Sequence, residues 1–339
     1  MQKDSGNAQI VDVCIVGAGV VGLFLSTQLI QSKKKVAIVE TSKIFGGQIN
    51  LYLEKKIYNF PLIDCITGKN IVNELQKKNI NENCSIFLHS IIANIIETDI
   101  GFAVEIQEKG GELKKIVCKY LVLATGKGSI KPNKLPFEDA KIIEGKQLFY
   151  SVRDKQKFCG KDVIIAGGGD SVIDWSCELV DIAKSVVVVH RRDIDRPENP
   201  EFLHFKELCN SGRIRLKVPY NITNLIIGND GFNGIKVSSA KSLEEEIYCD
   251  YILAFYGLKT IQENFDAFKD FNIKFDENGI FVNYANNETS YKNIFAIGDC
   301  CQYNGKIKNI FMGFTDAMRC FYEICNREHG KIDIYGHKC

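Results

Sequence analysis

Three glycines near the start of the chain have the spacing of a phosphate-binding loop. Gly17, Gly19 and Gly22 follow the pattern G-x-G-x-x-G. The first glycine allows a tight turn, the second lets a pyrophosphate approach the main chain, and the third lets a helix pack close to a strand. Glu40 follows about 20 residues further on, where a carboxylate can accept hydrogen bonds from a ribose diol. This combination predicts a dinucleotide site.

A second glycine-rich run starts at Gly167 and reads G-G-G-D-S through Ser171. It is followed by His190, Arg191 and Arg192, with Arg196 a little further on. Arginine forks at this position suit a ribose 2′-phosphate, so the second site is expected to prefer NADPH to NADH. A solvated basic strand end is the alternative.

The second run departs from the usual pattern at one position. Val172 stands where Gly or Ala is usual, so the following helix is expected to lie slightly further from its strand.

Further polar residues lie where a flavin nucleotide could be held. Gln48 follows Gly46–Gly47 in a loop that either positions a cofactor or is an ordinary polar turn. Tyr52 could stack on a flavin ring or simply pack. Asp299 ends the run A-I-G-D, and a carboxylate at such a strand end can bind a ribityl hydroxyl of FAD. A helix expected from Gly313 would direct its positive end towards the same place.

The elements that must position these residues are two βαβ units. Apolar runs at residues 11–16 and 36–39 predict buried strands around a helix, and runs at 162–166 and 185–189 repeat the arrangement around a helix through residue 182. Between them, shorter strands are expected at 84–88, 91–96, 102–107 and 114–117, with a separate buried strand at 120–124. Two such units are much harder to obtain by chance than one.

Composition indicates a globular protein without a polyanionic partner. Of the 339 residues 45% are hydrophobic and 25% charged, and the formal net charge is +1. Residues 1–9 lack the apolar core of a secretory signal. The 13 cysteines form no C-x-x-C pair, so most are expected to be small buried hydrophobes in a reducing cytoplasm. The adjacent Cys300 and Cys301 are interpreted as thiols in preference to a strained disulfide.

These features predict an α/β protein with two Rossmann-like domains, each with three layers of ββα type. Residues 1–128 and 258–339 are expected to form a discontinuous FAD-binding domain, and residues 129–257 an inserted NADPH-binding domain. The last segment includes the C-terminal tail.

The chain resembles the thioredoxin-reductase-like ferredoxin–NADP reductases of bacteria, within the class-II pyridine nucleotide-disulfide oxidoreductase superfamily. The resemblance covers nearly the whole chain and is anchored on the motifs G-A-G-x-x-G at Gly17, F-G-G-Q at Phe45, A-T-G at Ala124, G-G-G-D-S at Gly167, D-W at Asp174, H-R-R-D at His190 and A-I-G-D at Ala296.

The resemblance implies two cofactors and a set of contacts for each. Residues implied to bind FAD are Gly17, Gly19, Gly22, Glu40, Gln48, Tyr52, Ile92, Ile130 and Asp299. Residues implied to bind NADPH are Gly167, Gly169, Asp170, Ser171, Arg191, Arg192 and Arg196. It further implies a homodimer that passes hydride from NADPH to flavin N5 and then single electrons to a ferredoxin or flavodoxin. No metal and no catalytic side chain is implied, and neither nucleic acid nor a membrane is an expected partner.

The chain departs from the family pattern in two places. Only Cys159 stands where thioredoxin reductases carry a redox C-x-x-C, so thioredoxin reduction is not expected. The reductases usually end in a tail with a Ser or Thr and an aromatic residue or His that covers the flavin of a partner subunit. This tail has neither Ser nor Thr, so Tyr335 or His337 is the candidate cover, and a solvated His337 is the alternative. Two alternatives remain: a flavoprotein with oxygen or a quinone as acceptor, and a non-catalytic sensor that binds both nucleotides.

Overall fold

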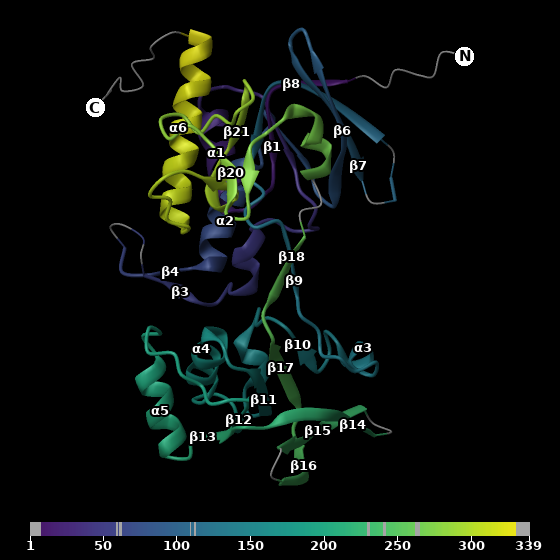
Figure 1. Cartoon of the computed structure of the whole chain (residues 1–339), viewed down its shortest axis with the longest axis vertical. Helices are drawn as coiled ribbons and strands as arrows, with labels where there is room; N and C mark the ends of the chain where they lie inside the picture. Colours follow the sequence, from purple (N-terminus) through teal and green to yellow (C-terminus); the bar gives the residue numbers. More distant parts are fainter. Residues whose placement is uncertain are drawn as a thin grey trace. The chain divides into compact units, whose positions relative to one another are not determined.

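The computed structural model describes residues 8–58, 60, 63–108, 110–111, 113–228, 231–239, 242–261 and 265–329. The chain divides into two compact units (Figure 1). Unit 1 comprises residues 1–50, 55–130 and 260–339, and unit 2 comprises residues 51–54 and 131–259. The chain passes between the units along β9 (Ser129–Pro132) and β18 (Leu258–Ile261), which pair with each other.

A seven-stranded sheet forms the centre of unit 1. Its strands are β1 (Gln9–Val16), β2 (Val36–Val39), β5 (Cys84–Phe87), β6 (Ser90–Thr98), β7 (Gly101–Glu108), β8 (Leu113–Leu123) and β21 (Ile294–Ala296). The order is β5-β2-β1-β8-β7-β6, with β21 also paired to β8. The pairs from β5 to β8 and the β8–β21 pair are parallel, and β6, β7 and β8 form an antiparallel meander. Strands β2 and β21 are apolar and buried at every position, as expected where both faces of a parallel sheet are covered.

Strand β8 corrects one prediction. The sequence suggested separate strands at 114–117 and 120–124, but β8 runs without a break through Lys119. One edge of β8 pairs with β1. The other edge pairs first with β7, up to Cys118, and then with β21 from Leu121 onwards. Two partners follow one another along this edge, so a polar interruption in the sequence does not end the strand.

Three helices pack together in unit 1. They are α1 (Val20–Gln31), α2 (Gly68–Asn79) and α6 (Ile310–His329), and α1 contacts both of the others. Phe24 of α1 stacks on Phe314 of α6 with ring centroids 4.3 Å apart. Helix α6 begins before the predicted start at Gly313 because the Asn309 side chain accepts a hydrogen bond from the Met312 amide at 2.8 Å.

Shorter elements complete unit 1. They are the 3-10 turns η1 (Gly47–Leu51), η3 (Phe265–Phe271) and η4 (Gly298–Cys300), the paired strands β3 (Lys56–Ile57) and β4 (Ile66–Thr67), and a small sheet of β19 (Phe275–Asp276), β20 (Gly279–Phe281) and β22 (Cys301–Gln302). Turns η1 and η4 carry two of the predicted site residues.

Unit 2 repeats the βαβ design on a smaller scale. Its parallel sheet has the order β10-β17-β11-β12-β13. These strands are β10 (Leu148–Phe149), β11 (Asp162–Gly167), β12 (Ser185–Val189), β13 (Ile214–Lys217) and β17 (Tyr251–Phe255). The helices are α3 (Ala140–Ile143), α4 (Asp170–Leu179) and α5 (Phe202–Asn210), with the 3-10 turn η2 (Lys155–Phe158). An antiparallel sheet is formed by β14 (Asn221–Gly228), β15 (Gly231–Ser239) and β16 (Ser242–Tyr248).

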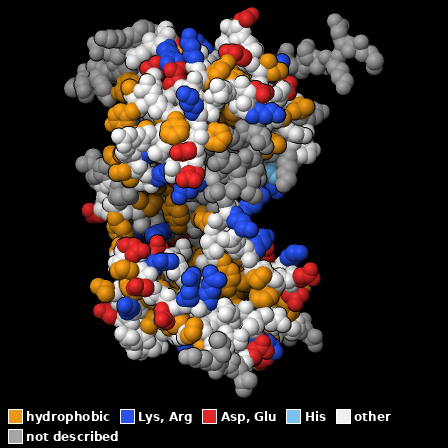
Figure 2. Space-filling model, in the orientation of Figure 1, with side chains coloured by type: hydrophobic (Ala, Val, Ile, Leu, Met, Phe, Trp, Pro, Cys, Tyr) orange, Lys and Arg blue, Asp and Glu red, His pale blue; other side chains and the backbone are white. Residues whose placement is uncertain are grey.

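These elements confirm the predicted α/β class with two Rossmann-like βαβ units. Helix α4 ends at Leu179, earlier than the predicted residue 182. Figure 2 shows Lys and Arg side chains interspersed with Asp and Glu, in keeping with the net charge of +1. Within the described ranges, no helix combines the length and the apolar character that crossing a membrane requires.

Candidate nucleotide-binding sites

The first glycine loop connects β1 to α1, and two of its glycines are required by close packing. Gly17 has φ of 113°, and a Cβ there would lie 2.5 Å from the carbonyl oxygen of Ala124. A Cβ on Gly22 would overlap the carbonyl oxygen of Gly17. A side chain at either position would push the start of α1 away from the strands, so the sequence-based reasons for these two glycines hold in the structure.

Gly19 has a different surrounding. It is the N-cap residue of α1, with φ −67° and ψ 169°, and no side chain caps this helix. A Cβ on Gly19 would meet no atom within 4 Å outside its immediate chain neighbours and its own helix. The backbone is therefore open on this side, at a helix end whose first amides have no acceptor within the helix. Room and unused donors at a helix N-terminus fit a pyrophosphate.

Glu40 follows β2 and is folded onto the same loop. Only 8% of this residue is exposed, and its Oε2 accepts a hydrogen bond from the Ala18 amide at 2.7 Å. The other oxygen accepts one from the Ser42 amide, also at 2.7 Å. A carboxylate has about four acceptor positions, so capacity remains for ribose hydroxyls. The sequence predicted the ribose contact but not that Glu40 holds the glycine loop in place.

The loop of Gly46 and Gly47 lies against the glycine loop. The Gly46 amide donates to the carbonyl of Ala18 at 2.9 Å, and a Cβ on Gly47 would lie 3.0 Å from Cα of Gly19. Asn50 donates to the Phe45 carbonyl at 2.6 Å, so its amide shapes the loop. Asn50 therefore has the role of a polar residue in an ordinary turn.

Gln48 and Asp299 are brought together by the fold. The Gln48 Nε2 donates to Asp299 Oδ2 at 3.4 Å, although the two residues are 251 positions apart in the chain. A Cβ on Gly126 would lie 3.3 Å from the same Nε2, so η1, η4 and the turn after β8 converge here. Three segments that the sequence singled out independently thus form one polar site.

The remaining predicted FAD residues are placed less directly. Tyr52 follows η1 and is half-buried. Ile92 lies in β6 and is only 4% exposed, with its side chain in the core of unit 1, so any nucleotide contact would involve its main chain. Ile130 belongs to β9, but its side chain is outside the described part of the structure. The roles of these three residues stay predictions.

The second glycine loop connects β11 to α4. Gly167 has φ of 136°, and a Cβ there would overlap the carbonyl oxygen of Phe255. Gly169 is the uncapped N-cap residue of α4, and a Cβ on it would again meet nothing within 4 Å outside its chain neighbours and its helix. Asp170 and Ser171 start the helix and are exposed. The open backbone at Gly169 fits a second pyrophosphate.

Val172 is accommodated by the core. Its side chain is fully buried in the cluster beneath α4. A Cβ on Gly167 would lie 3.1 Å from Val172 Cγ2, so the helix contacts the strand through a side chain at this point. In unit 1 the corresponding contact is made by the bare backbone of Gly22.

His190 has a structural role that the sequence did not reveal. A Cβ on Gly168 would overlap its imidazole ring, so the ring lies directly on the glycine loop. Partial burial lowers the pKa of His190, and the neighbouring Arg191, Arg192 and Arg196 lower it further. The extra glycine between Gly167 and Gly169 was the one signal of this contact in the sequence.

The three arginines after β12 are available to a ligand. Arg191, Arg192 and Arg196 are exposed, and none forms an ion pair with another described residue. A phosphate group between them would gain charge-assisted hydrogen bonds without breaking existing ones. This observation fits the 2′-phosphate of NADPH better than a free ribose hydroxyl.

Cys300 and Cys301 are both free, buried thiols. The Cys300 Sγ lies 3.2 Å from the carbonyl oxygens of Leu123 and Ile297, which share its one hydrogen, and the Cys301 Sγ lies 3.2 Å from the Gly298 carbonyl oxygen. Burial raises the pKa of both thiols, so neither is a reactive thiolate. The structure therefore agrees with the thiol interpretation, and the two side chains serve to connect the ends of β8, β21 and η4.

Two further expectations concern a metal site and the residues that cover the flavin. In the part of the chain that the structure covers, no group of three His, Cys, Asp or Glu residues could hold a metal ion. Tyr335 and His337, predicted as possible flavin covers, lie outside the described residues.

Comparison with known proteins agrees with this geometry. Residues 11–319 match the family described as pyridine nucleotide-disulphide oxidoreductase. A protein of Orientia tsutsugamushi (strain Ikeda) named ferredoxin–NADP reductase is 33% identical over 330 residues, which are 96% of this chain and 95% of that protein. A protein of the same name from Wolbachia pipientis wMel is 34% identical over 317 residues, covering 92% of this chain and 91% of the relative.

Solved structures show the same fold. Thioredoxin reductase of T. acidophilum superposes with a TM-score of 0.70 at 21% identity and covers 94% of this chain and 99% of its own. The bacillithiol disulfide reductase of Staphylococcus aureus has a TM-score of 0.68 at 17% identity, covering 95% and 100%. At these identities the likeness concerns the fold alone.

Proposed function

Because the chain belongs to the pyridine nucleotide-disulphide oxidoreductase family, we propose that it is an FAD-dependent enzyme that transfers electrons between NADPH and a ferredoxin or flavodoxin. The relatives named ferredoxin–NADP reductase cover nearly the whole chain at 31–34% identity, which supports this activity. Bound FAD would supply the redox chemistry, by accepting hydride from NADPH and passing electrons on singly.

The observation that carries the proposal is the contrast between the two second-strand ends. Glu40 turns a carboxylate towards the first glycine loop, while Arg191 and Arg192 leave their guanidinium groups exposed beside the second. A carboxylate accepts hydrogen bonds from ribose hydroxyls and repels a 2′-phosphate, whereas arginines attract one. FAD is therefore assigned to unit 1 and NADPH to unit 2.

In unit 1 the chain would bind and orient FAD. The open backbone at Gly19 and the first amides of α1 hold the pyrophosphate, and Glu40 accepts from the adenosine ribose. The paired Gln48 and Asp299 lie at the convergence of η1 and η4, where Asp299 can accept from a ribityl hydroxyl. None of these residues must gain or lose a proton, so the protein contributes position and exclusion of water.

The thiols of the chain argue against a disulfide substrate. Cys159 is the one cysteine before the second glycine loop in the region where a redox dithiol would stand, and it is an exposed thiol. Cys300 and Cys301 are buried with raised pKa values. Without a dithiol, electrons cannot pass from flavin to a protein disulfide by thiol exchange. A one-electron acceptor protein needs no such pair.

Three finer features belong to the proposal. The enzyme acts as a homodimer, as the resemblance implies. Its proposed location is a reducing cytoplasm, which the free thiols of the 12 described cysteines support. Its acceptor is a small iron–sulfur or flavin protein that binds transiently.

The test is an anaerobic titration of the purified protein. We expect a yellow protein whose visible flavin bands bleach on addition of NADPH and recover on addition of oxidised ferredoxin. A colourless protein that takes up no FAD would overturn the proposal. Bleaching that is reversed as fast by oxygen or a quinone as by ferredoxin would favour another acceptor, and a yellow protein that NADPH does not bleach would favour a sensor.

A further inference from the structure

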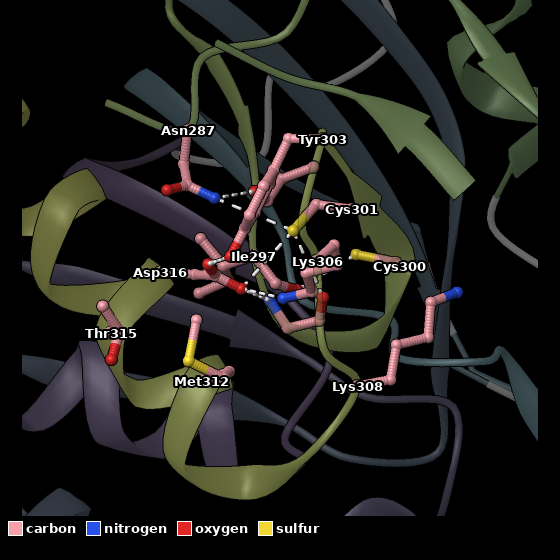
Figure 3. Close-up of polar contacts among 12 residues, drawn as sticks. Asn287, Ile297, Cys300, Cys301, Tyr303, Lys306, Lys308, Met312, Thr315 and Asp316 are labelled. Atoms are coloured by element: carbon pink, nitrogen blue, oxygen red, sulfur yellow. Dashed lines mark hydrogen bonds and ion pairs between the residues drawn. The ribbon is translucent and has the colours of Figure 1, made fainter. Parts of the chain in front are cut away.

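A buried charge cluster lies beside η4 in unit 1 (Figure 3). The Asp316 side chain of α6 is 0% exposed, and the Lys306 side chain that pairs with it is 1% exposed. Tyr303 donates its hydroxyl to Asp316 Oδ1 at 2.8 Å, and the Cys301 Sγ, whose one hydrogen also faces the Gly298 carbonyl, lies 3.4 Å from Oδ2. Arg319, one turn further along the helix, lies 3.8 Å from Oδ1. Tyr303 and Lys306 donate hydrogens to this carboxylate, while Arg319 adds a nearby positive charge without a hydrogen bond.

Stability alone is a poor reason for such a cluster. Removing two charges from water costs several kcal/mol per ion, and apolar residues of similar volume often stabilise a core as well as a buried ion pair does. What the cluster does provide is a fixed acceptor, because a carboxylate is acceptor-only and can serve several donors at once. The question is which of those donors belongs to the site.

The decisive donor is the amide of Gly298. It donates to Asp316 Oδ2 at 3.1 Å, and both groups are buried. Gly298 has φ of 75°, a left-handed conformation that glycine adopts at little cost, and this hydrogen bond adds a fixed contact to it. The next residue is Asp299, whose carboxylate accepts from Gln48 at 3.4 Å. One hydrogen bond therefore connects the charge cluster to Gly298, the residue that precedes the site residue.

The same point is connected to the first glycine loop. Val21, in the first turn of α1, lies next to both Gly298 and Gly313. A Cβ on Gly298 would lie 3.4 Å from the Val21 side chain, and a Cβ on Gly313 would overlap it. Helix α6, turn η4 and the start of α1 thus meet around Gly298. A shift of η4 would therefore displace the N-terminal end of α1, where the pyrophosphate is proposed to bind.

We propose that Asp316 is a positioning residue for the FAD site: its carboxylate, charge-balanced by Lys306, holds the Gly298 amide and so sets the orientation of Asp299. The inference rests on the proposed function for the identity of the ligand. It extends to Tyr303, which holds the other oxygen of Asp316 and thereby limits rotation of the carboxylate.

The test is a double-mutant cycle on FAD affinity, measured by reconstituting the apoprotein with FAD. The four proteins are the wild type, Asp299→Asn, Asp316→Asn and the double variant. If Asp316 acts through Asp299, Asp316→Asn weakens FAD binding by about tenfold in the wild type and by less than about threefold when Asp299 is already changed, within the range of couplings between residues of one network. The visible circular dichroism of bound flavin should change in the same variant.

A matched control separates positioning from loss of stability. Glu328, near the other end of α6, forms a second largely buried ion pair with Lys34, with side-chain exposures of 12% and 9%. Glu328→Gln breaks that pair without touching η4, so it should lower the melting temperature and leave FAD affinity unchanged. Asp316→Glu, which retains the charge, should recover part of the affinity.

Tyr303→Phe keeps the test decisive if Asp316→Asn does not fold. This variant leaves the ion pair intact and removes one donor to Asp316. It should weaken FAD binding in the same direction by a smaller factor. Additive effects of Asp299→Asn and Asp316→Asn, or an equal loss of affinity in Glu328→Gln, would overturn the inference. Absence of FAD from the wild type would instead overturn the proposed function.

Discussion

The two glycine loops of this chain have similar backbones but different surroundings. Gly17 and Gly167 both take positive φ, and Gly19 and Gly169 both leave open space at an uncapped helix start. Beyond that they diverge. In unit 1 the helix contacts the strand through Gly22, whereas in unit 2 the buried side chain of Val172 occupies the contact.

The second-strand ends differ more strongly. Glu40 is 8% exposed and holds the first loop through the Ala18 amide. After β12, the His190 ring lies on Gly168 and the arginines face solvent. The two loops therefore share the backbone on which phosphate binding is proposed, and they differ in whether the strand end presents an acceptor or cations, which is the difference expected to select the nucleotide.

The largest expected effect concerns the cations. Changing Arg191 and Arg192 together to Ala removes two charge-assisted contacts to a 2′-phosphate, each worth about 1.5–3 kcal/mol. The KM for NADPH should rise strongly and that for NADH should stay nearly constant in steady-state assays. Arg215→Ala, an exposed arginine of the same unit, is the control and should change neither. Equal increases for both nucleotides would mean that the arginines do not read the phosphate.

The glycines of unit 1 should separate packing from binding. Gly22→Ala places a Cβ on the Gly17 carbonyl, so the free energy of unfolding of the apoprotein should fall by about 3 kcal/mol. Gly19→Ala adds a Cβ into open space and should cost less than about 1 kcal/mol, yet FAD affinity should be lost. Urea unfolding and FAD content measure the two effects. If Gly19→Ala bound FAD normally, the pyrophosphate would not lie at this loop.

Replacement of Glu40 should have a moderate effect on both the stability of the protein and its affinity for FAD. Glu40→Gln keeps the size of the side chain but weakens its bonds to the Ala18 and Ser42 amides. Since hydrogen bonds to a charged group are stronger than neutral ones, the free energy of unfolding should fall by about 1 kcal/mol and FAD should bind less tightly. Glu74→Gln on the exposed face of α2 should leave both unchanged. An unaltered FAD affinity in Glu40→Gln would remove Glu40 from the site.

The smallest effect is a pH dependence from His190. Its pKa is lowered in the folded protein by burial and by the arginines, so the unfolded chain binds the proton more readily. The contribution of His190 to the free energy of unfolding should therefore decrease as the pH falls below the ordinary value of about 6.5. Histidine NMR should show the pKa moving back up in the Arg191→Ala, Arg192→Ala protein. A pKa that does not move would place the arginines away from the ring.

Much of the fold was predictable because its signals are local. The strands at 36–39 and 185–189 are observed with those bounds, since each is a short apolar run bounded by polar residues. The glycine loops were predictable for the same reason. The unbroken strand β8 was not predictable, because it depends on pairing with β7 and then with β21 along the same edge. The earlier start of α6 was not predictable either, because it depends on capping by the Asn309 side chain.

The candidate sites divide in the same way. Glu40 and the arginines were found from their distance to a glycine loop, which is a property of consecutive residues. The cluster around Asp316 left no such signal, because its members are scattered through the segment from Cys301 to Arg319 and their shared burial is visible only after folding. Ile92 shows the converse: a residue implied by resemblance whose side chain the fold places in the core.

Two βαβ units, one ending in an acid and one in arginines, were readable from the order of the residues, since spacing along a strand–loop–helix segment is preserved when the chain folds. Only the tertiary structure decided that Gln48 meets Asp299 and that Asp316 holds the Gly298 amide. Contacts between segments far apart in the chain depend on how the sheet and its helices pack. The spacing of residues along the sequence does not give the distance between packed segments in space.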